Sequence, residues 1–281
     1  MSFKVIKGTF HITGYSPDGD SIRFKADNEE DWKNLESGKV RLNKKGHAQL
    51  RIEAIDTLET HYDNEHQPLQ FAKLATDTLF SLLGIKHVTW NAAGSKVVSA
   101  DDGVRGYVVA RMAEKYGRPV SFVFPETAAL GPAKELFLDG KTVRKSVNYK
   151  LLQKGLAYPT FYDGMFYDLR ELFEKAAKAA REKGKGLWAS DTTNTLFAVK
   201  ALSDVTDAHV IMPKLFRRIT AHFKKHGNFD AHLFKDELAK DKERVLILSI
   251  LHFTHFDNLI VVNKQGKLKL STEPENLVFL G

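Results

Sequence analysis

The alternation of apolar and polar residues predicts a β-rich N-terminal part. Residues 3–15 (FKVIKGTFHITGY) alternate over most of their length, the turn-forming stretch 16–20 (SPDGD) follows, and residues 21–26 (SIRFKA) resume the alternation. Two alternating runs joined by a Pro-Asp-Gly turn are typical of a β-hairpin. We expect further strands at residues 47–56, 87–92 and 105–113.

A period of three to four residues indicates helices further along the chain. Residues 67–84 carry apolar side chains at helical spacing and end at Gly84; these side chains are Leu69, Ala72, Ala75, Leu79 and Leu82. Residues 145–157 are expected to form a helix that ends near Gly155. Residues 168–184 are rich in Ala, Glu, Lys and Arg and predict a long amphipathic helix.

Two stretches interrupt this scheme. Residues 29–40 (EEDWKNLESGKV) are polar and show only weak helical periodicity, so we expect an excursion from the sheet. Residues 113–138 carry Pro119, Pro125 and Pro132, which favours a loop-rich insertion with one short strand or helix.

The pattern changes again near residue 190, where Gly184, Gly186 and a polar stretch mark a domain boundary. Residues 213–227 and 229–242 predict two helices, and Pro213 is well placed at a helix start. Short apolar runs at 244–253, 258–264 and 267–272 predict strands. The expected architecture is therefore α+β, with one domain at 1–190 and a small α+β accessory domain at 191–281.

Composition and charge narrow the function classes. The chain has 281 residues and no cysteine, which excludes disulfides, thiolate catalysis and cysteine-based zinc sites. The net charge of +7 favours a polyanionic partner such as nucleic acid. No apolar run approaches the 18 residues of a membrane span, so no membrane partner is expected. The N-terminus lacks the apolar block of a signal peptide, and we expect a cytoplasmic protein.

The stretch IEAIDTLETHY at 52–62 carries the candidate chemistry. Asp56, Thr57 and Glu59 follow directly on an apolar strand, a pattern that also suits a simple helix cap. The turn at 18–20 adds Asp20, and Asp20 with Asp56 supplies the hard oxygen ligands that calcium or magnesium prefers.

Two arginines extend this set. Arg51 precedes Asp56 by five residues, and Arg105 begins a predicted strand. Guanidinium groups hold phosphate oxygens bidentately, so the combination indicates metal-assisted cleavage of a phosphodiester. In such a reaction the arginines stabilise the transition state and Glu59 positions or deprotonates the attacking water.

These segments together resemble the staphylococcal nuclease (thermonuclease) family. The family pattern of Asp-Gly-Asp, Arg-x-x-x-x-Asp-Thr-Pro-Glu and Gly-Arg-Gly is similar to DGDS at 18–21, RIEAIDTLE at 51–59 and VRG at 104–106. The order continues with DGKTVRKSVN at 139–148, QKGLAY at 153–158 and GKGLW at 184–188. The resemblance runs from about residue 3 to residue 190.

The resemblance implies a fold, a reaction and a set of roles. The fold is a five-stranded barrel of the OB type with packed helices, and the activity is a calcium-dependent nuclease acting on DNA, RNA or both. Asp20, Asp56 and the carbonyl of Thr57 would hold calcium. Arg51 and Arg105 would bind the phosphate, and Glu59 would act on the water. The alternative is a non-catalytic OB-fold module that binds nucleic acid or a partner.

The chain departs from the family pattern at several positions. Leu58 replaces the usual Pro, Val104 replaces a Gly and Ser21 replaces a Thr, all without loss of the charged groups. The pair at 102–103 (Asp-Gly) stands where the family has residues that contact a terminal nucleotide phosphate. The stretches 27–48 and 113–138 are insertions relative to the compact family.

The C-terminal part offers one candidate surface. Arg217, Arg218, Lys224 and Lys225 form a basic stripe on the first of its predicted helices. A solvated helix face explains such a stripe, and a nucleic-acid contact is the alternative.

Overall fold

The computed structural model describes residues 2–131 and 134–281, and the chain divides into two compact units. Unit 1 comprises Met1–Glu53 and Lys73–Leu151, and unit 2 comprises Ala54–Ala72 and Leu152–Gly281. Pro132, in the predicted loop-rich insertion, lies outside the described residues.

Unit 1 is built on one curved sheet. Among the described residues it has seven strands, ordered β3-β2-β1-β8-β9-β4 with β10 paired to β1. Their bounds are β1 Phe3–His11, β2 Arg23–Ala26, β3 Ala48–Gln49, β4 Arg51–Ile52, β8 Val104–Ala113, β9 Pro119–Pro125 and β10 Glu135–Leu136. The order begins at β3 and ends at β4, yet only Leu50 separates these strands in sequence. The two edges therefore meet, and the sheet forms a nearly closed barrel.

The predicted N-terminal hairpin is confirmed. β1 pairs antiparallel with β2, and Phe10 lies opposite Phe24 with both rings fully buried. β1 also pairs with β8, where Gly8 faces Gly106. A Cβ atom at Gly8 would lie 2.0 Å from the carbonyl oxygen of Lys25, so only glycine allows this close approach.

Residues 113–138 are more regular than the expected loop-rich insertion with one short strand or helix. The expected strand is present as β9, but it is seven residues long and belongs to the main sheet, and β10 is a second, shorter strand. The prolines of β9 stand at its two ends, where a missing N–H donor is tolerated.

The remaining elements of unit 1 are short apart from one helix. α1 (Leu69–Leu83) confirms the predicted helix at 67–84 and continues from unit 2 into unit 1. α3 (Val147–Gln153) confirms the core of the helix predicted at 145–157, although its last residues belong to unit 2. The other elements are η1 Glu29–Asn34, β6 Thr89–Trp90, β7 Val97–Ser99, η2 Glu126–Ala128 and α2 Gly140–Val143.

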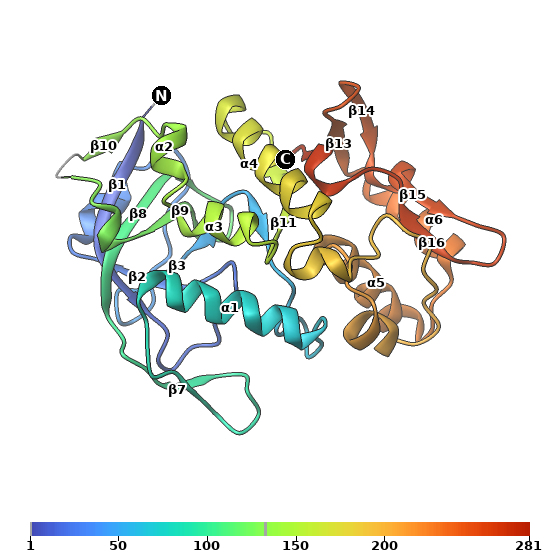
Figure 1. The fold of residues 1–281 in the computed structure, drawn as a ribbon, viewed down its shortest axis with the longest axis horizontal. Helices are drawn as coiled ribbons and strands as arrows, with labels where there is room; N and C mark the ends of the chain where they lie inside the picture. Colours follow the sequence, from blue (N-terminus) through green and yellow to red (C-terminus); the bar gives the residue numbers. More distant parts are fainter. Residues whose placement is uncertain (1, 132–133) are drawn as a thin grey trace. The chain divides into compact units, whose positions relative to one another are not determined.

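Unit 2 contains the C-terminal helices and strands (Figure 1). Its helices are α4 Tyr167–Glu182, α5 Pro213–His226 and α6 Ala231–Asp241, with helical turns η3 Gly186–Ala189, η4 Asp204–Ala208, η5 Phe256–Leu259 and η6 Pro274–Asn276. Its strands are β5 Ile55–Asp56, β11 Tyr158–Pro159, β12 Phe161–Tyr162, β13 Arg244–Ile247, β14 His252–His255, β15 Ile260–Val262, β16 Leu268–Leu270 and β17 Leu277–Phe279. Two helices followed by mostly antiparallel strands confirm the predicted C-terminal pattern.

One hydrophobic core joins the two sequence regions of unit 2. Leu58, Tyr158 and Trp188 belong to the same buried cluster as Phe216 and Phe279. The buried hydroxyl of Tyr158 donates to Asp191 across 2.5 Å, which ties β11 to the chain just after residue 190. The domain boundary expected near 190 stays a prediction. Residues just before it (Leu187, Trp188) and just after it (Phe197, Val199) belong to this same core.

Candidate active site

The Asp-Thr-Leu-Glu segment begins where a short buried strand ends. Asp56 closes β5, which pairs antiparallel with β11, and Thr57 follows in the same buried setting. The loop after Glu59 is closed by Gln67, whose backbone N–H donates to the carbonyl of Glu59. The buried Gln67 amide also donates to the carbonyl of Ile211 across 2.8 Å. The loop is therefore fixed at both ends.

Two carboxylates of this segment bind one guanidinium group. Arg217 on α5 donates from Nη2 to Asp56 Oδ2 across 2.6 Å and from Nη1 to Asp56 Oδ1 across 3.1 Å. Nη1 also donates to Glu59 Oε1 across 2.6 Å. Asp56 and Glu59 thus converge on a single cation supplied by a residue 161 positions away from Asp56.

This cluster is largely removed from water. The side chains of Arg217, Asp56 and Glu59 are 29%, 9% and 14% exposed. Burial alone would lower the pKa of Arg217, but Asp56 and then Glu59 raise that pKa above its ordinary value. The guanidinium therefore stays charged and offsets the two carboxylates.

The remaining residues of the predicted set lie in unit 1. The carbonyl of Asp20 accepts from the backbone N–H of Ile52 across 3.0 Å, which fixes the Asp-Gly-Asp turn beside β4, the strand that carries Arg51. In the same turn, Asp18 Oδ1 is buried and has no hydrogen-bond partner among the residues that the structure describes. A buried carboxylate oxygen in this condition gains from a nearby cation.

Arg105, on β8, forms a different kind of ion pair. Its two terminal nitrogens donate to the two oxygens of Asp27 across 2.6 and 2.7 Å. Both side chains are nearly half exposed, at 45% and 47%. The hydrogen bond from Arg105 lowers the pKa of Asp27, and the same contact raises the pKa of Arg105.

The structure therefore divides the predicted set between the two units. It brings Asp56 and Glu59 together in unit 2, while Asp20, Arg51 and Arg105 belong to unit 1. A joint calcium site formed by Asp20, Asp56 and Thr57 stays a prediction.

Sequence reasoning missed the role of Arg217, which it placed in a basic stripe. Every cation of this stripe forms an ion pair inside unit 2: Arg217 with Asp56 and Glu59, Arg218 with Asp241 and Glu243, Lys224 with Asp63, and Lys225 with Glu237. The stripe is therefore used within the protein, which argues against its proposed role as a nucleic-acid surface.

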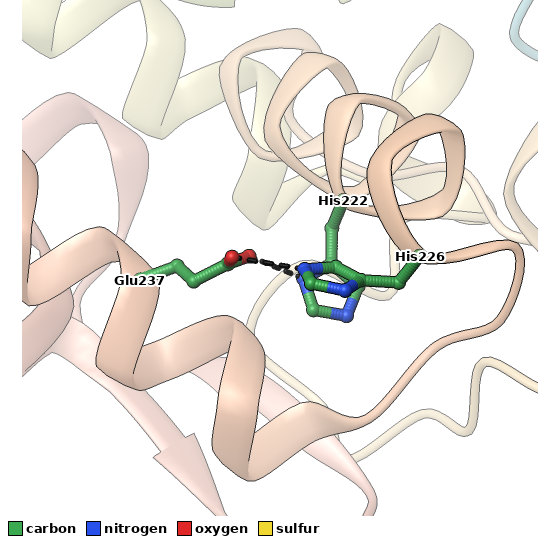
Figure 2. A group of neighbouring side chains, drawn as sticks. All are labelled: His222, His226 and Glu237. Carbon is green, nitrogen blue, oxygen red and sulfur yellow. Dashed lines mark hydrogen bonds and ion pairs between the residues drawn. The ribbon is translucent and has the colours of Figure 1, made fainter.

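A second polar cluster joins α5 to α6. Figure 2 shows His222 and His226 facing Glu237, whose oxygens lie 2.7 Å from His222 Nδ1 and 2.9 Å from His226 Nε2. Hydrogen bonds from Lys225 and then His226 lower the pKa of Glu237 to about 2. The three ligand-type atoms lie within 4.8 Å of one another, but they already satisfy each other through hydrogen bonds. These hydrogen bonds form a network that holds α5 and α6 together.

The chain matches a known protein family over part of its length. A family model described as staphylococcal nuclease homologue matches residues 49–190, about half of the chain. The match includes Arg51, Asp56, Glu59 and Arg105, and it leaves out Asp20 and Arg217. A search of curated proteins finds no match. Among the described residues, no helix is both long enough and apolar enough to cross a membrane.

Proposed function

The chain belongs to the staphylococcal nuclease homologue family, and from this premise we propose that it is a metal-dependent nuclease. The reaction is the hydrolysis of phosphodiester bonds in DNA, RNA or both. The observation that carries the proposal is the convergence of Asp56 and Glu59 on one cationic group within the matched segment. Two neighbouring carboxylates that are mostly removed from water are costly without a cation, which supports a role for them beyond a helix cap.

The donor set suits a hard divalent cation such as calcium. Asp20, Asp56 and the carbonyl of Thr57 offer oxygen ligands, and Asp18 holds a buried oxygen without a partner in the same turn as Asp20. Both oxygens of Asp56 already accept hydrogen bonds from Arg217. A metal at Asp56 would therefore take the place of the guanidinium. When bound, it would polarise the phosphodiester and offset part of its charge.

The protein's own residues supply the other functions in this proposal. Arg105 is exposed and donates from both terminal nitrogens to Asp27, so an incoming phosphate could replace that carboxylate. Arg51, on β4, adds a second guanidinium for the charge that develops at phosphorus. Glu59 would orient the attacking water and accept its proton once Arg217 has moved away.

A second candidate is a nucleic-acid-binding module without catalysis. The observation in its favour is the same ion pair, because a guanidinium that never leaves Asp56 and Glu59 turns both carboxylates into structural groups. Permanent pairing would occupy the proposed ligand Asp56 and the proposed base Glu59, while the arginines of unit 1 would still bind phosphate.

Hydrolysis assays separate the two candidates. The full chain is incubated with single-stranded DNA, duplex DNA and RNA, each with calcium, with magnesium and with EDTA. The proposal predicts cleavage that requires a divalent cation and falls at least about 10²-fold in Glu59→Gln. Binding of the same substrates without cleavage in any metal would establish the binding module instead.

A further inference from the structure

A cationic cleft lies on unit 1, apart from the residues assigned above. It has a volume of about 510 Å³, and four of its lining side chains carry a positive charge: Arg23, Arg41, Lys44 and Arg118. No acidic side chain lines the cleft among the described residues. Four like charges around one depression repel one another, so an anion inside it would be stabilised.

Seven of the nine described residues that line the cleft come from two segments, 41–44 and 116–118, and Arg23 on β2 and Gln49 on β3 complete the lining. Arg41 and Lys44 belong to the insertion at 27–48, and Arg118 comes from the turn between β8 and β9. The backbone N–H of Arg41 donates to the carbonyl of Gly117 across 2.9 Å, which fixes the two segments together. A Cβ atom at Gly117 would lie 2.7 Å from the Cβ of Arg41, so this approach depends on glycine.

The cationic groups are only partly neutralised. Arg118 donates from Nε to Glu114 across 3.1 Å. Within residues 2–131 and 134–281, neither Arg41 nor Lys44 forms an ion pair. Arg23 packs its guanidinium over the ring of Tyr15 at 5.2 Å, and burial lowers its pKa. These groups therefore hold positive charge that the surrounding protein does not offset.

An exposed aromatic ring at the same cleft points to the kind of anion. Tyr116 lines the cleft and is 65% exposed. A cationic groove with an accessible aromatic ring is the arrangement by which proteins hold single-stranded nucleic acid, since the cations follow the phosphates and the ring stacks on an unpaired base. A volume of about 510 Å³ exceeds what one phosphate fills.

We propose that the cleft between residues 41–44 and 116–118 is a binding site for the backbone of single-stranded nucleic acid, with Tyr116 stacking on a base. The inference rests on the proposed function for its biological meaning, but binding at the cleft needs neither metal nor catalysis. The cleft would hold the strand outside the catalytic residues and raise the affinity for long substrates.

The test measures binding of the full chain to a fluorescent single-stranded oligonucleotide in EDTA. The cleft variant combines Arg41→Gln, Lys44→Gln and Arg118→Gln, and the matched control combines Lys178→Gln, Lys240→Gln and Lys264→Gln. The control removes the same charge from exposed lysines outside the cleft. We expect the cleft variant to bind at least about tenfold more weakly, and its salt dependence to flatten by about 0.7 for each lost phosphate contact. We expect the control to stay within about threefold of the native chain.

Tyr116→Ala tests the stacking contact without a change in charge. We expect it to weaken binding by about tenfold while leaving the salt dependence unchanged. Because Tyr116 is exposed, this variant should fold normally, which circular dichroism checks. Equal binding by the native chain, the cleft variant and Tyr116→Ala overturns the proposal. Competition by millimolar inorganic phosphate with no effect of Tyr116→Ala also overturns it, in favour of a site for a single phosphate.

A small chromogenic phosphodiester separates this proposal from the proposed function. If the native chain hydrolyses it with a metal while the cleft variants bind nucleic acid normally, the nuclease stands and the cleft proposal fails. If the native chain never hydrolyses it while the cleft variants lose binding, the cleft proposal stands and the nuclease fails.

Discussion

The two units each hold part of the predicted catalytic charge, but they hold it differently. In unit 1, Arg105 pairs with Asp27, and both side chains are nearly half exposed. In unit 2, Arg217 pairs with Asp56 and Glu59, and both carboxylates are mostly buried. An exposed ion pair contributes about 0–1 kcal/mol, whereas removing one partner of a buried pair typically costs about 3–5 kcal/mol.

In the proposed mechanism, this contrast means that Arg105 can bind phosphate directly, whereas Asp56 and Glu59 must first be released from Arg217. A phosphate can displace Asp27 from Arg105 at little cost, because the pair is already in contact with solvent. A metal that binds Asp56 must displace a guanidinium that makes three hydrogen bonds to the two carboxylates. Freeing Asp56 and Glu59 from Arg217 therefore costs more free energy than freeing Arg105 from Asp27.

The largest expected effect is on stability. Arg217→Ala should lower the free energy of unfolding by about 3 kcal/mol, at the low end for a buried pair because the guanidinium keeps some contact with water. Arg105→Ala should cost less than about 1 kcal/mol. Urea denaturation of both variants measures the difference. Equal losses would show that burial does not distinguish the two ion pairs.

The next effect is on the reaction. Arg105→Lys keeps the charge but loses the planar fork that holds two phosphate oxygens, so cleavage should fall by about 10²-fold with stability retained. Arg51→Lys should act in the same way. Initial rates on an oligonucleotide with calcium measure both variants, with Lys178→Gln as an exposed control. A variant that retains full activity would remove its arginine from the mechanism.

The smallest expected effect is on the pH dependence of stability, through Asp27, the carboxylate of the exposed ion pair. The pKa of Asp27 is lowered in the folded protein, so its contribution to stability is present above the usual pKa of about 4 and is lost as the pH falls through the lowered value. Asp27→Asn should therefore cost less than about 1 kcal/mol at pH 7, and the difference from the native chain should shrink as the pH falls and Asp27 becomes protonated in the folded protein. Thermal unfolding at several pH values measures it. A loss that persists at low pH would mean that Asp27 acts through contacts other than its charge.

The sequence predicted the regular parts of the fold because their signals are local. Alternation located β1 and β2, and helical spacing located α1, α4, α5 and α6. For residues 113–138 the sequence predicted only one short strand or helix in a loop-rich insertion, because Pro119 and Pro125 look like loop signals; in the structure they mark the two ends of β9. The same local reasoning found the carboxylates of the candidate site, since Asp56 and Glu59 follow directly on a strand.

The role of Arg217 depends on contacts that no local pattern shows. Arg217 and Arg218 are neighbours on α5 and look equivalent in the sequence, yet one binds the candidate catalytic carboxylates and the other binds Asp241 and Glu243. Only the packing of unit 2 brings Arg217 to Asp56 across 161 positions of the chain. Arg217 and Arg218 therefore differ in their partners because of where each side chain lies in the folded unit, and not because of residue type.

The central proposal is that Asp56 binds the metal and Glu59 acts on the water, and that Arg217 occupies both carboxylates until the metal binds. Calcium titration of the full chain by calorimetry tests it directly, with Arg217→Gln compared against the native chain and Arg218→Gln as the neighbouring control. We predict that Arg217→Gln binds calcium at least about tenfold more tightly than the native chain and that Arg218→Gln does not, because Arg217 pairs with Asp56 and Arg218 pairs with Asp241 and Glu243. Unchanged calcium affinity in Arg217→Gln, or no binding by either protein, would contradict it.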